Sequence, residues 1–209
     1  MISAKSHGII KMKEIFEMKK ILLILIFAFF HLALFAAPFG LKMGMTIDEI
    51  SAQCEEKPSF VKDDIYLVKP KKSHPLFEEY AVYVNKTIGL YQIRAFSKPI
   101  ACNKYGSEIQ NSFNNLKDRI AKTYGKPRII NEINQDSMFS GKDYWFYTLK
   151  DGSRVLAAAW DEKTLPDNLF AIALDCVAYN GYLEGDAHLI LCYYFNNFKS
   201  VEDEQDDVF

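Results

Sequence analysis

Histidine, glycine and proline are all scarce in this sequence. The chain of 209 residues contains four histidines, ten glycines and seven prolines, and 49% of its residues are hydrophobic. This composition excludes a collagen-like or disordered chain and supplies enough apolar side chains for a sizeable core. Because only His74 and His188 lie beyond residue 37, few histidines are available for acid–base or metal chemistry.

Motifs that bind phosphate or carry a serine nucleophile are missing as well. The sequence has no G-x-G-x-x-G or G-x-x-x-x-G-K-S/T loop, no G-x-S-x-G motif and no C-x-x-C pair. Its formal net charge of −2 offers no basic surface for nucleic acid. We therefore predict no nucleic-acid partner, no cofactor, no metal site and no catalytic residue.

The amino-terminal region has the build of an export signal. Lys19-Lys20 precedes an apolar run of 15 residues, Ile21 to Phe35, and small residues follow at Ala36 and Ala37. This order is typical of a secretory signal peptide, so we predict that residues 1–36 are removed and that the product is periplasmic or secreted. An uncleaved anchor is the alternative, because the run is close to the minimum for crossing a bilayer. In the first case the chain contacts the membrane only through this segment, before cleavage.

The two ends of the sequence carry further segments outside the expected domain. Residues 1–17 add nothing that a signal peptide needs, so Met18 is our preferred translation start, with a long amino-terminal region as the alternative. No cysteine lies near Ala36, which disfavours a lipid-anchored lipoprotein. Residues 201–209 contain five carboxylates and no cation, which predicts an acidic, disordered tail. A single α+β domain is expected between them, at 37–200.

Four cysteines lie in the part of the chain expected to be exported: Cys54, Cys102, Cys176 and Cys192. An even number of cysteines in an oxidising compartment favours disulfides. Cys176 and Cys192 lie in two strand-like runs joined by a turn, so a hairpin can place them side by side and leave Cys54 to pair with Cys102. Four free thiols, buried as small hydrophobic groups, are the alternative.

Two helices are predicted. The first starts at Thr46, which forms a capping box with Glu49, and it ends near Cys54 because Lys57-Pro58 cannot continue it. The second carries apolar residues at spacings of four, three, four and four, which gives one continuous apolar stripe. The residues of the stripe are Ile109, Phe113, Leu116, Ile120 and Tyr124.

Extended runs separated by turn residues fill most of the remaining domain. No helical crossover separates most of these runs, which favours hairpin connections and an antiparallel sheet. We predict an α+β fold of two helix-plus-strands repeats, at about 40–100 and 103–198, forming one open antiparallel sheet of about 7–8 strands with two helices on one face. The predicted runs are 65–69, 79–85, 89–96, 128–133, 144–149, 154–160, 170–179 and 188–195.

The start of the first repeat resembles a known family. Gly44-Met45-Thr46 followed by Glu49-Ile50 and Lys57-Pro58 is similar to the opening of the small outer-membrane assembly lipoproteins, which look related to β-lactamase-inhibitor-protein repeats. The second repeat keeps only Tyr124 to Pro127 of this pattern. The resemblance implies helix-plus-sheet repeats that bind other proteins and have no catalytic centre. The chain as a whole also resembles uncharacterised exported bacterial proteins.

One loop and two aromatic residues are the candidate binding residues. The segment 69–77 joins two predicted strands and presents Lys71, Lys72, His74, Leu76 and Phe77, a mixture that is common in recognition loops. In the alternative, Leu76 and Phe77 fold back onto the edge of the sheet. Trp145 and Tyr147 lie on a predicted strand and complete the set, because Tyr and Trp provide large contact areas.

These observations favour a non-catalytic protein-binding module of the cell envelope, with another envelope or secreted protein as its partner. The module would use the helix-free face of its sheet together with the 69–77 loop. A small exported hydrolase that uses His188 with a nearby carboxylate or cysteine, Cys176 or Cys192, is one alternative. A protein that binds an apolar ligand is the other.

Overall fold

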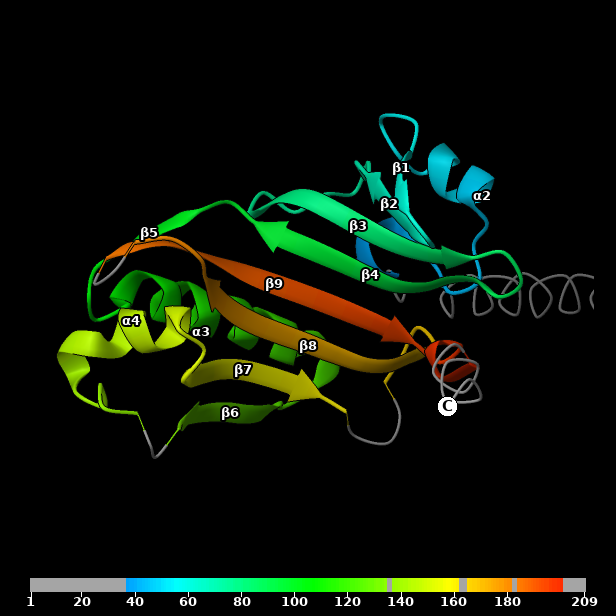
Figure 1. Cartoon of the computed structure of the whole chain (residues 1–209). Coiled ribbons are helices and arrows are strands. Elements are labelled where there is room, and N and C mark those ends of the chain that lie inside the picture. Colours follow the sequence, from blue (N-terminus) through cyan, green and yellow to red (C-terminus); the bar gives the residue numbers. More distant parts are fainter. Residues whose placement is uncertain (1–36, 135–136, 162–164, 182–183, 201–209) are drawn as a thin grey trace, which may run out of the picture. The chain divides into compact units, whose positions relative to one another are not determined.

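The computed structural model describes residues 37–134, 137–161, 165–181 and 184–200. The predicted signal segment and the predicted acidic tail lie outside these residues. The elements, labelled in Figure 1, are η1 (Pro38–Gly40), α2 (Ile47–Ala52), β1 (Ser59–Lys62), β2 (Ile65–Val68), β3 (Phe77–Asn85), β4 (Gly89–Ser97), β5 (Ile100–Cys102), α3 (Ser107–Tyr124), β6 (Arg128–Ile133), η2 (Lys142–Tyr144), α4 (Trp145–Lys150), β7 (Arg154–Trp160), β8 (Leu169–Ala178) and β9 (Gly185–Phe195).

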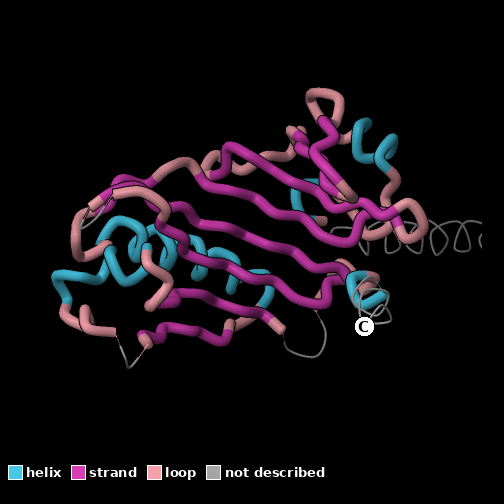
Figure 2. Tube along the Cα trace, viewed as in Figure 1, coloured by secondary structure: helices cyan, strands magenta, loops and turns pink. Residues whose placement is uncertain are grey.

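The strands form one antiparallel sheet, as predicted. Its order among the described residues is β1-β2-β3-β4-β9-β8-β7-β6, and β5 pairs with the start of β9. The first half of the domain passes from α2 through strands to β4, and the second half passes from α3 through strands to β9. Strands β4 and β9 pair at the centre of the sheet (Figure 2). The α+β class and the open antiparallel sheet are therefore confirmed.

The first helix, α2, begins as its capping signals predict. The backbone N–H of Thr46 donates to Glu49 Oε2 at 2.8 Å, and the N–H of Glu49 donates to Thr46 Oγ1 at 3.4 Å. These bonds satisfy two amide groups that the first turn leaves without partners. The helix buries Ile50 completely in the core that it shares with the sheet.

The second helix, α3, packs its apolar stripe on the sheet. Ile109, Phe113, Leu116 and Ile120 are buried, while Tyr124 is half-buried. The helix contacts β5, β8 and β9. In Figure 1 it runs behind these strands. Among the described residues, the helices therefore cover one face of the sheet, and the other face carries no described helix.

The predicted strand at 144–149 is wrong, because these residues form η2 and α4. Helical spacing turns Trp145, Phe146 and Leu149 together into the core, where Phe146 is completely buried. The Phe146 N–H donates to the carbonyl of Lys104, and Thr148 Oγ1 donates to the carbonyl of Trp145. Aromatic residues favour strands in isolation, but burial against α3 and the sheet outweighs that preference here.

Candidate functional site

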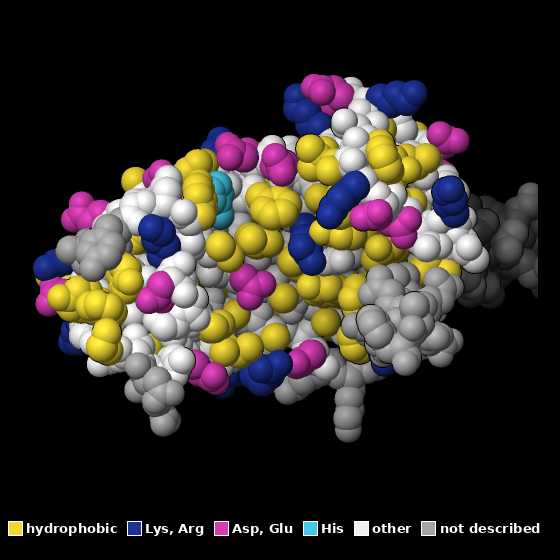
Figure 3. Space-filling view, viewed as in Figure 1, with side chains coloured by type: hydrophobic (Ala, Val, Ile, Leu, Met, Phe, Trp, Pro, Cys, Tyr) yellow, Lys and Arg dark blue, Asp and Glu magenta, His cyan; other side chains and the backbone are white. Residues whose placement is uncertain are grey.

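The strand register separates the residues of the two faces of the sheet. In β9, Leu189, Leu191 and Tyr193 point into the helix-covered core, so the alternating residues lie on the other side. We call this other side the open face. Figure 3 shows it, with hydrophobic side chains over much of its centre and a few charged groups between them.

Two cross-strand rows define the centre of the open face. One row runs Phe96, Ile190, Asp175, Ala157, Ile130 from β4 to β6, and the next runs Arg94, Cys192, Ala173, Ala159, Arg128. The small side chains of Ala157, Ala159 and Ala173 on β7 and β8 form a low surface between larger side chains, which we call the alanine floor. Large apolar residues beside the floor are exposed, Val155 at 46% and Val177 at 40%. Exposed apolar side chains that gather on one face of a sheet are a feature of interaction sites.

An aromatic–arginine corner lies at one end of this face, and consists of Tyr83, Tyr91, Gln92, Arg94, Tyr194 and Phe198. The β3–β4 register passes from Tyr83↔Gln92 to Val84↔Leu90, so Tyr91 is the extra residue of a bulge. Ring centroids lie 6.0 Å apart for Tyr83–Tyr91, 6.1 Å for Tyr91–Phe198 and 5.0 Å for Tyr194–Phe198. The Arg94 guanidinium carbon lies 5.1 Å from the Tyr83 ring centre, within reach of a cation–π contact.

Two hydrogen-bond donors in the corner have no acceptor among the described residues. Gln92 is only 3% exposed, yet its Nε2 has no partner among the described residues. The Nε of Arg94 is buried and is likewise unpaired within the described part of the chain. Burial raises the pKa of Tyr91 and of Tyr194 to about 12, so both phenols remain neutral at physiological pH. Neutral aromatic rings therefore lie around the Arg94 guanidinium, and the carboxylates of Asp64 and Asp175 are close enough to raise the pKa of Tyr91 and of Tyr194, respectively.

Asp175 is the acidic group at the centre of the face. It is half-buried between Ile190 and Ala157, and burial raises its pKa while the charge of Arg94 lowers it. No ion pair within 4.0 Å and no hydrogen bond joins this carboxylate to another described residue. Its charge is therefore available to a group that approaches from outside.

The histidine proposed for the hydrolase alternative does not meet a cysteine. His188 Nδ1 lies 2.6 Å from the Ser97 carbonyl oxygen, to which it donates, and Nε2 lies 2.5 Å from the Tyr179 hydroxyl. Both ring nitrogens are thus occupied, and the ring stacks on Tyr179. Cys176 lies on the opposite face of the sheet, and Ile190 separates His188 from Cys192 along β9. A cysteine–histidine nucleophile is not assembled.

The predicted disulfides are wrong, and the alternative of four buried free thiols is confirmed. Cys176 pairs with Leu189 and Cys192 with Ala173, so the two cysteines are three residues out of register and point to opposite faces. Cys54 forms a β-bridge with Pro70, whereas Cys102 lies at the end of β5 opposite Gly185.

The thiols are expected to resist alkylation in the folded protein. Burial raises the pKa of Cys102 and of Cys192 to about 11, and it also raises the pKa of Cys54 and of Cys176. Since only the thiolate reacts, native protein at about pH 8 should take up iodoacetamide at least about 100-fold more slowly than an unfolded chain. Intact mass spectrometry without reductant should show four alkylations after unfolding in guanidinium chloride. A maximum of two would instead reveal a disulfide.

The 69–77 loop folds back onto the domain. Phe77 is 6% exposed and Leu76 is half-buried against the core. His74 is bound within the loop, because its Nδ1 accepts from the Leu76 N–H and its backbone N–H donates to the Tyr80 hydroxyl. Lys71 and Lys72 are exposed, and Lys71 Nζ donates to the Ala52 carbonyl at 2.8 Å. The loop therefore presents lysines, and its two apolar residues pack inward.

Trp145 and Tyr147 do not lie on the open face. Trp145 is 9% exposed in α4. Tyr147 is half-buried, and its ring centroid lies 5.0 Å from that of Phe139. The sequence missed the corner residues because their meeting depends on the bulge at Tyr91 and on the pairing of β4 with β9.

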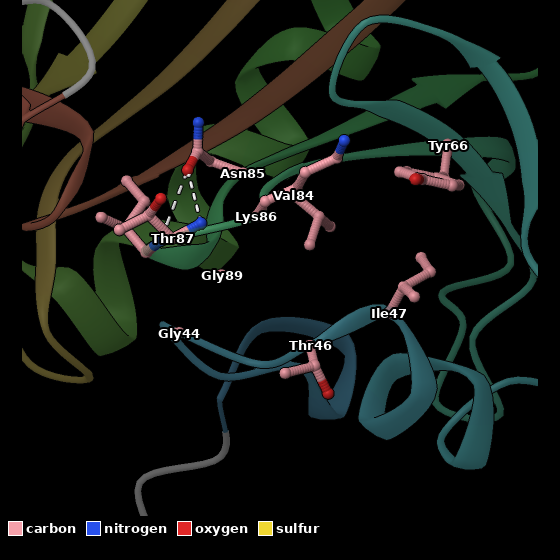
Figure 4. Close-up of a pocket in the computed structure, with 10 residues that line it drawn as sticks. Gly44, Thr46, Ile47, Tyr66, Val84, Asn85, Lys86, Thr87 and Gly89 are labelled. Atoms are coloured by element: carbon pink, nitrogen blue, oxygen red, sulfur yellow. Dashed lines mark hydrogen bonds between the residues drawn. The ribbon is translucent and has the colours of Figure 1, made fainter. Parts of the chain in front are cut away.

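A separate pocket lies between the start of α2 and the β3–β4 hairpin. Its volume is about 310 Å³, and Figure 4 shows Thr46 and Ile47 on one side and Asn85 and Thr87 on the other. Asn85 Oδ1 accepts from the Thr87 and Ile88 N–H groups and Asn85 Nδ2 donates to Asp64 Oδ2, so both polar atoms of this side chain already have partners. Among the described residues, the pocket therefore presents no unpaired polar group of the kind found in the corner.

The described residues contain no cluster of His, Cys, Asp or Glu able to hold a metal ion, and none of their helices is long and apolar enough to cross a membrane. Comparisons with protein families, with curated proteins and with solved structures found no match.

Proposed function

We propose that this chain is an exported, non-catalytic protein-binding module of the cell envelope, and that its open face contacts another protein. The predicted export signal supports the location. The observation that carries the proposal is the one-sided arrangement of the helices. They leave bare a sheet face with exposed valines, a floor of alanines and a corner of aromatic residues with an arginine.

The composition of this face suits protein recognition. Tyr and Arg are enriched at the energetic centres of interfaces, and the corner places Arg94 beside Tyr83, Tyr91 and Tyr194. The alanine floor lets a partner backbone approach the sheet closely. Exposed apolar side chains such as Val155 and Val177 lose water contact when a partner covers them, which is favourable.

Cross-linking in living cells tests the proposal. A photo-reactive amino acid at position 177 should give one discrete cross-linked species, whereas the same amino acid at the exposed position 122 of α3 should give none. Changing both Val155 and Val177 to Lys should reduce cross-linking from a third open-face position, 171, at least about tenfold, because a buried charge opposes docking. The thermal midpoint should remain close to wild type, since both valines are exposed.

Equal cross-linking from position 122 and position 177, or full cross-linking in the double lysine variant, would contradict the proposal. Lys122→Glu is the matched charge change on the helix side, and it should leave the open-face cross-link intact.

A further inference from the structure

We propose that β6 is a self-pairing edge, to which a second copy of this chain adds its own β6 in the antiparallel direction, with Ile130 on the symmetry axis. Backbone hydrogen bonds and a reciprocal pairing of Arg128 with Glu132 hold the two copies together. The inference concerns the edge of the sheet, so it does not depend on the proposed function of the open face.

The two outer strands of the sheet differ in how they are protected against pairing. Strand β1 has four residues, ends in Lys62, and shifts its register with β2 between Phe60 and Lys62. Short length, bulges and lysines are common means of preventing edge pairing. Strand β6 pairs with β7 without a register shift and contains no lysine or proline. Among the described strands, only β7 pairs with it (Figure 1).

The backbone of β6 offers a second row of hydrogen-bonding groups. The Asn134 N–H donates to the Ser153 carbonyl at 2.7 Å, which fixes the alternation along the β6–β7 ladder. In an antiparallel ladder, every second residue turns its N–H and C=O toward the same neighbour. Even-numbered residues of β6 therefore bond to β7, and odd-numbered residues turn these groups toward the free edge. The outward residues are Ile129, Asn131 and Ile133.

Charge complementarity identifies a second copy as the occupant of this edge. When Ile130 lies opposite itself, Arg128 of each copy lies opposite Glu132 of the other copy. Opposite charges directly across antiparallel strands are stabilising. Glu132 is exposed and forms no ion pair with another described residue, while Arg128 is held only by the exposed carboxylate of Asp161, at 2.7 Å. Both charged groups are therefore accessible to a second copy.

The neighbouring registers fit less well. Centring the pair on Asn131 would place Arg128 opposite the neutral Asn134, so both charge pairs would be lost. Centring it on Ile129 would place Pro127, which has no N–H, at a hydrogen-bonded position. The sequence of β6 thus favours the register with Ile130 at the centre.

Pairing in this register also covers apolar surface. Ile129 is 47% exposed, although its partner Ala158 is completely buried on the helix-covered side. The two copies of Ile129 become diagonal neighbours across the axis, within reach of each other, and are removed from water. The symmetry axis is perpendicular to the sheet, so both open faces lie on the same side. The dimer therefore joins two open faces into one surface.

Sedimentation velocity of the protein, purified as the cell makes it, tests the self-pairing. We expect a Kd on the order of 10 μM, with monomer at about 1 μM and mostly dimer at about 100 μM, as for a small interface. A protein that stays monomeric over this range would overturn the inference, also if position 131 then cross-links to a different protein in cells.

Engineered cysteines test the register. Ile130→Cys should form a disulfide between copies under mild oxidation, because Cα atoms of a non-hydrogen-bonded pair lie about 4.5 Å apart. Asn131→Cys is the matched control, since its two copies would lie more than about 7 Å apart and should link at least about tenfold less. The four native thiols are buried and should not compete. Equal yields at both positions, or a dimer that links at neither, would overturn the inference.

A charge exchange tests the pairing of Arg128 with Glu132. Arg128→Glu should raise the Kd at least about tenfold, because it places like charges opposite each other. Adding Glu132→Arg should return the Kd to within about threefold of wild type. The double change does not restore the ion pair with Asp161, so recovery reports the contact between copies. Dimerisation that stays weak in the double variant, with an unchanged thermal midpoint, would contradict the proposed pairing.

Discussion

Replacing Trp145 with alanine should destabilise the protein by about 3–5 kcal/mol, because it removes a large side chain from a packed core. The side chain is 9% exposed in α4 and belongs to the main core cluster. A Cβ built on Gly106 would lie 2.1 Å from the indole, so the ring packs directly on the backbone before α3. Arg154 lies over the Trp145 ring, with its guanidinium carbon 5.3 Å from the ring centre. Denaturation in guanidinium chloride measures the loss.

Tyr144→Ala is the matched control for Trp145. Tyr144 is 36% exposed at the end of η2, and removing it should change the free energy of unfolding by less than about 1 kcal/mol. Comparing the two variants also distinguishes a structural role of Trp145 from a binding role. Wild-type stability in Trp145→Ala, combined with lost cross-linking from the open face, would show a binding role, as the sequence alone suggested.

Substituting Gly89 with alanine should cost at least about 2 kcal/mol and should disturb the β3–β4 hairpin. Gly89 has a φ of +70°, and an added Cβ would lie 2.2 Å from the carbonyl oxygen of Gly44. The added Cβ would clash with backbone atoms of Gly44, which cannot rotate away as a side chain can. That backbone is held by hydrogen bonds from Gly44 N to Leu90 O and from Leu90 N to Met45 O, each 2.9 Å long. Separating the two segments would break both bonds.

Gly152→Ala isolates the cost of the backbone conformation alone. Gly152 has a φ of +79°, but a Cβ there meets nothing within 4 Å. We expect a loss of about 1 kcal/mol, the usual penalty for an alanine in the left-handed region. The two variants are compared by thermal and chemical unfolding. Equal losses at both positions would show that Gly44 moves away without cost and that the close approach contributes nothing.

The elements predicted correctly are those fixed by neighbouring residues. Thr46 and Glu49 form their capping box within one helical turn, and the α3 stripe repeats every three or four residues. Such signals lie within a few residues of each other, so a sequence displays them directly. The turn residues between neighbouring extended runs are of the same kind, and they support the prediction of hairpin connections and an antiparallel sheet.

The elements predicted wrongly depend on distant contacts. The residues of α4 have the composition of a strand, but the core behind them accepts a helix that buries Trp145, Phe146 and Leu149 together. Likewise, a turn between Cys176 and Cys192 suggests that they face each other. The register that actually forms offsets them by three residues and so sends them to opposite faces.

The sequence by itself determined the α+β class, the two main helices and most of the strands, because these follow from periodicity, turn residues and local capping. Tertiary structure alone decided which apolar side is covered and which residues meet on the open face. Arg94 and Tyr194 belong to strands about 100 residues apart, and Gln92 is buried beside Tyr83 only through the bulge at Tyr91. Pairing over such distances is set by the summed packing of whole strands, which no short stretch of sequence contains.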